Sequence, residues 1–154
     1  MEIKYQIFEN DNLLVHRLIG EFSIEKYIAY TRFITSQVIQ KQIFKVLVDF
    51  RMLAFPGAFT EVSDRVIKNV DEVSEIRKNI NKNELKDKNV VLVFWADKPL
   101  PAVVAHLFIE RISKSNYHYC SRDEKIVEIL KLPENFKELN KIVDNLEFKF
   151  EETP

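Results

Sequence analysis

The chain has 154 residues, 46% of them hydrophobic, which is enough for one compact domain with its own core. Its formal net charge of -1 gives no general attraction to nucleic acid or an anionic membrane, and its single cysteine excludes an internal disulfide. The first residues lack a secretory apolar core, and the longest apolar run, Val90–Ala96, is far shorter than the roughly 20 residues that span a bilayer. We therefore expect one cytoplasmic domain over residues 1–154, with no membrane span and no nucleic-acid partner.

The N-terminal residues predict a β-hairpin. Two β-prone runs, Ile3–Glu9 and Leu13–Leu18, are separated by Asn10–Asn12, residue types that tolerate the left-handed conformations of tight turns. Gly20 then breaks the pattern of the second run, so we expect the second strand to end before it.

A helix and a buried strand are predicted next. Ser23 is a suitable N-cap, and apolar residues recur at helical spacing over Ile24–Gln40. Phe44–Asp49 then has consecutive apolar residues, the pattern of a strand that is buried on both faces of a helix-covered sheet. We expect this strand to be central and to end at Asp49.

A long amphipathic helix is predicted after the loop that contains Pro56 and Gly57, ending near residues 81–83. The next strand, Val90–Trp95, is again apolar on both faces and stops before Asp97. The apolar stripe of the helix steps by three and four residues and consists of Phe59, Val62, Val66, Val70, Val73, Ile76 and Ile80.

The C-terminal third predicts further helices and one short strand. A helix begins at Asp97–Pro99, and a strand covers Tyr117–Cys120. Because Ser121–Glu124 matches a capping box, a second helix should start at Arg122. One more helix follows Leu132–Pro133, and we expect the acidic tail from about residue 147 to fray. The buried positions of the first and last helix are Val103, Val104, Leu107, Phe108, Ile112 and part of Arg111, and then Phe136, Leu139, Ile142, Val143 and Leu146.

The order of elements predicts an α/β fold, with a mostly parallel sheet that carries an N-terminal hairpin and is covered by helices. One strand ends in Val-Asp-Phe-Arg (48–51) and another in Trp-Ala-Asp (95–97). With these features, the chain resembles the STAS or SpoIIAA-like family, the fold of the anti-sigma factor antagonists. The resemblance covers residues 3–132 and implies a non-catalytic regulatory or protein-interaction module.

The resemblance does not extend to the phosphorylation switch of these antagonists. Their switch serine stands at the start of the helix after the third strand, whereas here Asp49 is followed by Phe50 and Arg51. The nearest hydroxyl groups belong to Thr60 and Ser63, farther along the chain. The closer resemblance is to the uncharacterised SpoIIAA-like proteins of bacteria, which keep the strand-end Asp-x-Arg without the switch serine.

Motifs for several chemistries are absent from the sequence. Its two glycines, Gly20 and Gly57, are far apart, which excludes the glycine-rich loops that hold phosphates. No serine lies in a Gly-x-Ser-x-Gly elbow. His118 and Cys120 share a strand face, but two ligands make an incomplete zinc site. We therefore expect no cofactor, no metal and no enzymatic activity.

Asp49 and Asp97 allow three interpretations, because ligands of α/β proteins bind beyond the carboxyl ends of strands. The two carboxylates could hold a divalent cation. Alternatively, Asp49 could accept a phosphoryl group as in response-regulator receivers, although Lys98 follows the wrong strand for that arrangement. We favour a third interpretation, in which both aspartates cap the following helix or turn and Arg51 pairs with one of them.

The expected loop over residues 50–58 is the candidate site for a protein partner, because aromatic and arginine side chains dominate interface energies. Phe59 fits the core stripe, whereas Phe50 and Phe55 either fold back onto the domain or contact a partner. The alternative function is a carrier of small apolar ligands or lipids, since the CRAL-TRIO fold resembles this family, and a homodimer is left open. The predicted partner-binding residues are Asp49, Phe50, Arg51, Phe55, Thr60 and Ser63.

Overall fold

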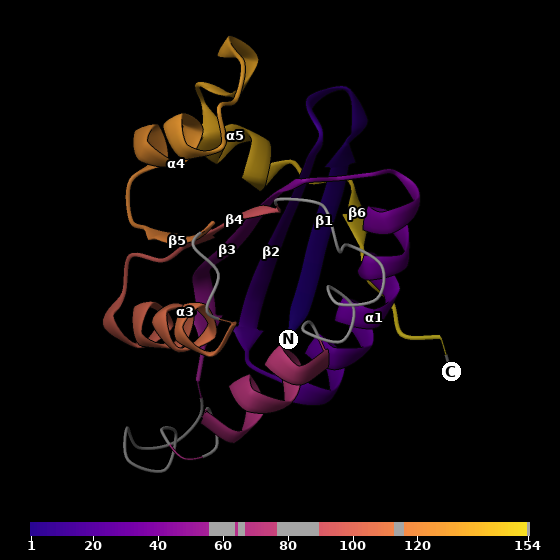
Figure 1. Cartoon of the computed structure of the whole chain (residues 1–154), viewed down its shortest axis with the longest axis vertical. Coiled ribbons are helices and arrows are strands. Elements are labelled where there is room, and N and C mark those ends of the chain that lie inside the picture. Colours follow the sequence, from indigo (N-terminus) through magenta and orange to yellow (C-terminus); the bar gives the residue numbers. More distant parts are fainter. Residues whose placement is uncertain (56–63, 65–66, 77–89, 113–115, 154) are drawn as a thin grey trace.

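Strands and helices alternate along the chain as predicted (Figure 1). The structure is a computed structural model that describes residues 1–55, 64, 67–76, 90–112 and 116–153. Between β3 and β4, residues 64 and 67–76 are helical. In chain order the elements are β1 (Glu2–Phe8), the 3-10 turn η1 (Glu9–Asp11), β2 (Leu13–Glu21), α1 (Ile24–Gln40), β3 (Lys45–Ala54), β4 (Val91–Trp95), α3 (Pro99–Ile112), β5 (Tyr117–Cys120), α4 (Asp123–Ile129), the 3-10 turn η2 (Glu134–Phe136), α5 (Leu139–Asp144) and β6 (Phe148–Lys149).

The strands form one six-stranded sheet in the order β5-β4-β3-β2-β1-β6. Strands β2 to β5 run parallel to their neighbours, whereas β1 pairs antiparallel with β2 and β6 pairs antiparallel with β1. The parallel centre and the N-terminal hairpin confirm the predicted α/β fold class. Both β3 and β4 are internal strands, as their apolar runs predicted.

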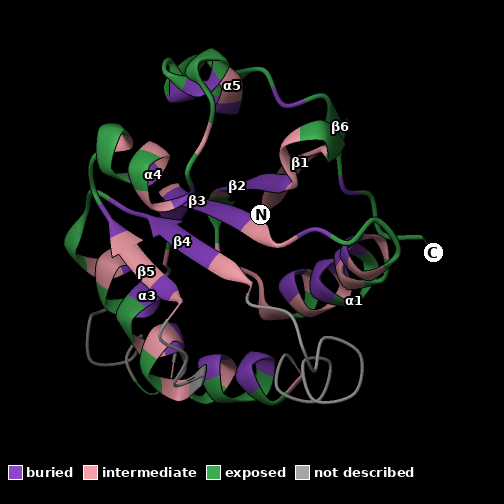
Figure 2. Ribbon diagram, turned by 45° about the horizontal axis from the view of Figure 1, so that its top comes forward, coloured by how far each residue is buried: buried purple, intermediate pink, exposed green. Residues whose placement is uncertain are grey.

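Two apolar cores lie on opposite faces of the sheet, because successive side chains of a strand alternate between the faces. On one face, α1, α3 and residues 67–76 pack against Leu14 and Val48. On the other face, α4, η2 and α5 pack against Leu47 and Val93. Buried residues therefore follow the strands and the inner sides of the helices (Figure 2).

Several local predictions are confirmed. Asn12 takes the left-handed conformation, with φ of 56°, in the turn between β1 and β2. The helix α1 has the predicted bounds, and the Ser23 Oγ accepts a hydrogen bond from the Lys26 backbone N–H at 3.3 Å. In residues 67–76, Val70 and Val73 of the predicted stripe are buried. The stripe positions Phe59, Val62, Val66 and Ile80, and the predicted end of that helix, lie outside the described residues.

Two strands are longer than predicted. The strand β2 continues through Gly20, whose φ of 86° favours glycine, and ends at Glu21. The strand β3 continues past Asp49 to Ala54, so residues 50–54 are not a loop. The polar residues that suggested a strand end instead find partners within the sheet, as described below.

Two details of the helices were predicted wrongly. The helix α4 begins at Asp123 after an N-cap, Arg122, that makes no side-chain capping bond. The Ser121 carbonyl accepts a hydrogen bond from the Trp95 Nε1–H at 3.4 Å, which ties the residue to β4 rather than to the helix start. On α3, Val103 of the predicted buried stripe is 43% exposed, while Ala105 is fully buried.

The predicted frayed tail is also wrong for its first residues. Phe148 and Lys149 form β6, which pairs with Tyr5 and Lys4 of β1. Phe150 is buried against α1. The prediction failed because residues 147–152 are mainly acidic, although Phe148 and Phe150 alternate among them. These two phenylalanines pack against β1 and α1, which are far away in the sequence.

Candidate functional site

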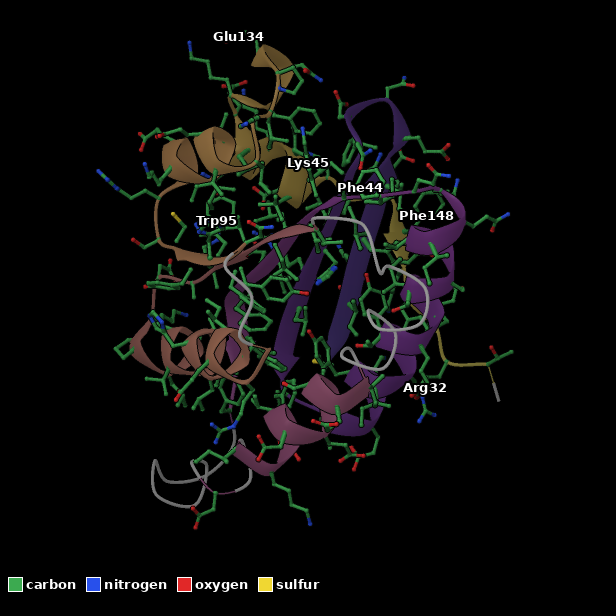
Figure 3. The ribbon with its side chains drawn as sticks, in the orientation of Figure 1. Arg32, Phe44, Lys45, Trp95, Glu134 and Phe148 are labelled. Atoms are coloured by element: carbon green, nitrogen blue, oxygen red, sulfur yellow. The ribbon has the colours of Figure 1, made fainter. Side chains whose placement is uncertain are left out.

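A row of four side chains crosses the sheet on the face that α4 and α5 cover. The strand registers place Arg17 of β2 beside Asp49 of β3, Asp49 beside Trp95 of β4, and Trp95 beside Cys120 of β5. Trp95 is labelled in Figure 3, at the end of β4 nearest α4. Asp49 is fully buried, so its charge requires partners inside the protein.

Two arginines neutralise Asp49. The Arg17 Nε–H donates to Asp49 Oδ2 at 2.7 Å. The Arg51 guanidinium binds both carboxylate oxygens, with Nε to Oδ1 at 2.9 Å and Nη2 to Oδ2 at 3.0 Å. The Arg51 backbone N–H also donates to Oδ1, at 3.0 Å. Paired, charge-assisted bonds of this kind are among the strong hydrogen bonds of proteins.

The position of Arg51 follows from an irregularity in β3. Arg17 lies beside Asp49, but Ile19 lies beside Met52, so β3 has one more residue than β2 in this interval. Such a bulge changes the direction of side chains locally. The guanidinium of Arg51 lies over the Trp95 ring, 3.3 Å from its centroid, where it makes a cation–π contact. By register Met52 shares the face of Ile19 and Arg17, and it is 50% exposed.

The same arginines hold α5 against the sheet. The Arg17 Nη1–H donates to Asp144 Oδ1 at 2.8 Å, and the Arg51 Nη1–H donates to Asn140 Oδ1 at 2.7 Å. Asn140 and Asp144 are four residues apart and therefore share one side of α5. The Asn140 amide in turn lies 3.5 Å from Asp123 Oδ2 at the start of α4. The network thus joins β2, β3, α4 and α5.

The electrostatics of this network favour permanently charged arginines. Burial would lower the pKa of Arg17, but the hydrogen bond and charge of Asp49, followed by those of Asp144, outweigh it and raise the pKa above its ordinary value. Two guanidinium groups face the two carboxylates Asp49 and Asp144, so these four charges sum to zero. Such an arrangement stabilises structure and leaves Asp49 without an oxygen to offer a substrate.

This geometry decides between the three interpretations of the aspartates. Asp49 lies within β3 and caps no helix, so the helix-capping interpretation is wrong for it, although its Oδ1 does accept a backbone N–H bond, from Arg51. Both of its oxygens bind arginine donors, which also opposes the cation and phosphoacceptor interpretations. Asp97 lies in the exposed segment between β4 and α3, and the pairing of Arg51 is with Asp49.

The predicted partner-binding residues do not form one surface. Phe50 is 1% exposed and contacts Phe94 on the opposite face of the sheet, with ring centroids 5.2 Å apart, so its placement in a loop was wrong. Phe55 packs against Phe22, with ring centroids 5.5 Å apart. Asp49 and Arg51 belong to the buried network. Thr60 and Ser63 lie outside the described residues.

Sequence reasoning missed Arg17, Trp95, Asn140 and Asp144. One signal was available for Arg17, because it is the only charged residue in the otherwise mainly apolar run 13–19. A charge within such a strand requires a buried counter-charge, and the neighbouring strand provides one in Asp49. No comparable signal marks Asn140 or Asp144, which are exposed polar positions of an amphipathic helix.

Among the described residues, no group of three or more histidine, cysteine, aspartate or glutamate side chains could hold a metal ion. In the same part of the chain, no helix combines the length and apolar character needed to cross a membrane.

Comparison with known proteins supports the fold. No protein-family model matches the chain, and no curated protein matches its sequence. Among solved structures, the anti-sigma factor antagonist SpoIIAA in its unphosphorylated form is similar to this chain, with a TM-score of 0.50 and 15% sequence identity. The match covers 85% of this chain and 98% of that one. The six-stranded sheet and its covering helices therefore have the SpoIIAA-like fold that the order of elements predicted.

Proposed function

We propose that this protein is a non-catalytic regulatory module that binds a protein partner on the sheet face beside α5. The observation that carries the proposal is the surface that Met52 and Arg51 form at the end of β3. Met52 exposes half of its area directly after an arginine whose guanidinium is fixed over Trp95. An exposed apolar side chain beside a fixed arginine is typical of interface centres.

The fold is consistent with this role. The similar structure SpoIIAA is described as an anti-sigma factor antagonist, which is a regulatory protein. In this chain, the network around Asp49 fixes Arg51 before any partner arrives, so that little side-chain entropy is lost on binding. Thr60 and Ser63, which lie outside the described residues, remain predicted partner contacts.

A role as a carrier of small apolar ligands or lipids remains the alternative function predicted from the sequence. Two grooves lined by described residues, of about 780 and 310 Å³, lie between α1 and the edge formed by β1 and β6. Both are open and contain charged side chains, which suits a protein surface better than a lipid tail. Native mass spectrometry of protein purified without detergent separates the two functions, since a carrier retains its ligand.

Site-specific photo-crosslinking tests the interaction site. We expect a photoreactive amino acid at Met52 to give one defined crosslinked species in the cells from which the protein comes. The matched control is Val103, another exposed apolar residue, which lies on α3 and is 43% exposed. Crosslinks of equal yield from both positions, or none from Met52, would move the site away from the end of β3.

The fixed arginine provides a second variant. Arg51→Ala removes contacts within the network as well as the surface, so loss of binding in that variant alone would not locate the site. Met52→Asp changes only an exposed side chain and should leave the urea midpoint unchanged. With the photoreactive amino acid moved to a neighbouring exposed position of β3, this variant should lose the crosslink to the partner. Retention of the same crosslinked species in Met52→Asp would contradict the proposal.

A further inference from the structure

The C-terminal strand β6 forms an open edge of the sheet. In the part of the chain that the structure describes, it is the last strand in the sheet order and pairs only with Lys4 and Tyr5 of β1. The Phe150 N–H donates to the Ile3 carbonyl at 2.9 Å. Because backbone groups alternate in direction along a strand, the N–H and C=O of Phe148 and Phe150 face β1, and those of residues 147 and 149 face outward. This edge can therefore accept another strand.

The side chains at this edge are aromatic on one face. Phe148 is 52% exposed and stacks on Tyr5, with ring centroids 5.6 Å apart. Phe33 of α1 is 36% exposed and makes an edge-on contact with Tyr5, with ring centroids 5.7 Å apart. Figure 3 labels Phe148 beside α1. Two of the four exposed large hydrophobic side chains among the described residues thus lie at one sheet edge. Phe148 lines the smaller of the two grooves there, and Lys149 and Phe150 line the larger one.

The sequence of this edge is complementary to itself. Residues 147–151 read Glu-Phe-Lys-Phe-Glu, so that the charges alternate in sign along one face and phenylalanines occupy the other. We propose that two copies of the chain join along β6, antiparallel about a two-fold axis at Phe148. In this register each Lys149 faces Glu147 of the second copy, and the two Phe148 rings meet.

The backbone favours the same register. With the axis at Phe148, residues 147 and 149 of the two copies form hydrogen-bonded pairs, because their N–H and C=O groups face outward. Phe148 then meets its copy in a non-hydrogen-bonded pair, where Cα atoms are about 4.5 Å apart and side chains contact most closely. A two-fold interface of this kind uses the same residues on both subunits.

Other registers are less favourable. An axis at Lys149 places two lysines opposite each other, which is destabilising. An axis at Phe150 pairs Lys149 with Glu151, but Phe150 is only 6% exposed and already packs against Tyr30 and Phe33. Lysine on a short edge strand commonly prevents pairing. In the proposed dimer, however, each Lys149 faces the exposed Glu147 of the second copy, which supplies the opposite charge.

Sedimentation velocity over a range of concentrations tests the proposal first. We expect a monomer–dimer equilibrium for the wild-type chain, and a monomer at every concentration up to about 1 mM, a value at which even weak association is visible, would overturn it. Phe148→Asp should produce a monomer with an unchanged urea midpoint. Val103→Asp, which changes an exposed residue of α3 outside both proposed binding surfaces, should dimerise like the wild type.

Charge exchange then tests the register. Lys149→Glu places two glutamates opposite each other and should raise the dimer Kd by roughly tenfold or more. The double variant Glu147→Lys with Lys149→Glu restores opposite charges and should recover the affinity. Failure of the double variant to recover, while it remains folded, would contradict the axis at Phe148.

A crosslink locates the axis directly. In a Cys120→Ala background, Phe148→Cys should form an intermolecular disulfide under mild oxidation, because the expected Cα separation lies within disulfide range. Val103→Cys in the same background is the control, because Val103 is exposed on α3, and it should remain monomeric on a non-reducing gel. A dimer band of equal yield in both variants would show random collision rather than the proposed pairing.

Discussion

Arg51 turns back along its own strand and holds Asp49, two residues earlier, with side-chain bonds of 2.9 and 3.0 Å and a backbone bond of 3.0 Å. Arg17 from the neighbouring strand completes the coordination of this carboxylate at 2.7 Å. One fully buried carboxylate therefore determines the positions of two arginines and, through them, of α5. Residues 49–51 of β3 thus hold α5 against the sheet, and the exposed Met52 that follows them is where we propose that a partner binds.

Asp49→Asn should destabilise the protein by about 3 to 5 kcal/mol, because the buried Arg17 and the half-buried Arg51 lose the charge that compensates them. The amide would also point an N–H₂ group at arginine donors. Urea denaturation measures the loss. Asp97→Asn is the matched control, and it should change the free energy of unfolding by less than about 0.5 kcal/mol, because Asp97 is exposed. Equal midpoints for the two variants would mean that the network contributes nothing to stability.

Arg51→Ala should expose Trp95 to water. Trp95 is the only tryptophan of the chain, it is 2% exposed, and the Arg51 guanidinium covers its ring. We expect the fluorescence maximum to move to longer wavelength and quenching by acrylamide to increase. Arg51→Lys should have an intermediate effect, since lysine keeps the charge but loses the planar, bidentate contact.

Arg111→Ala is the control for this measurement, because the Arg111 guanidinium binds Asp71 and lies outside the network. It should leave the emission spectrum unchanged. An unchanged spectrum in Arg51→Ala as well would show that the ring is shielded by other residues.

Leu47→Ala and Leu92→Ala should each cost about 2 to 5 kcal/mol, through lost burial and the cavity left behind. Leu47 is fully buried in the core beneath α4 and α5, and Leu92 is 2% exposed in the core beneath α1 and α3. Met52→Ala, on an exposed part of β3, should change the urea midpoint little. If either leucine variant matched Met52→Ala, the corresponding core would not be close-packed.

The elements that the sequence predicted correctly depend on local signals. The bounds of α1 follow from the spacing of its apolar residues and from the Ser23 cap, all within one short segment. The central strands were recognised because both faces are apolar. The end of β3 was missed because Asp49 and Arg51 resemble the start of an exposed loop, and only partners from other strands and helices show that they are buried.

The distances along the chain explain why the site was only partly predictable. Arg17 is 32 residues from Asp49, and Asp144 is 127 residues from Arg17. No periodicity or motif connects such positions in a single sequence. The same holds for β6, whose partner strand β1 lies at the opposite end of the chain.

Lys149 should titrate above its ordinary pKa of 10.5, because Glu2 accepts a hydrogen bond from it and the charge of Glu151 adds to the effect. A raised pKa in the folded state means that this contribution to stability is complete below the unfolded pKa and is lost as the pH rises through the folded value. NMR titration of the lysine side chains measures the shift. Glu2→Gln should lower the pKa of Lys149, while Glu134→Gln, remote in sequence and paired with Lys137, should not.

Phe150→Ala should cost about 3 kcal/mol, near the lower end for buried phenylalanine, because the residue lies at the sheet edge. Its ring lies 5.4 Å from that of Tyr30 and 5.3 Å from that of Phe33, and these contacts fix the tail on α1. Phe148→Ala, two residues away but 52% exposed, should have a much smaller effect on unfolding of the monomer.

Hydrogen exchange distinguishes a detached tail from a general loss of stability. If Phe150 anchors β6, its replacement should accelerate exchange of the Phe150 amide, which donates to the Ile3 carbonyl, far more than exchange of amides within β3 and β4. Equal acceleration throughout the sheet would indicate global destabilisation instead. Rapid exchange of the Phe150 amide in the wild type would mean that the tail is not held by β1, and the open edge of the sheet would then belong to β1 rather than to β6.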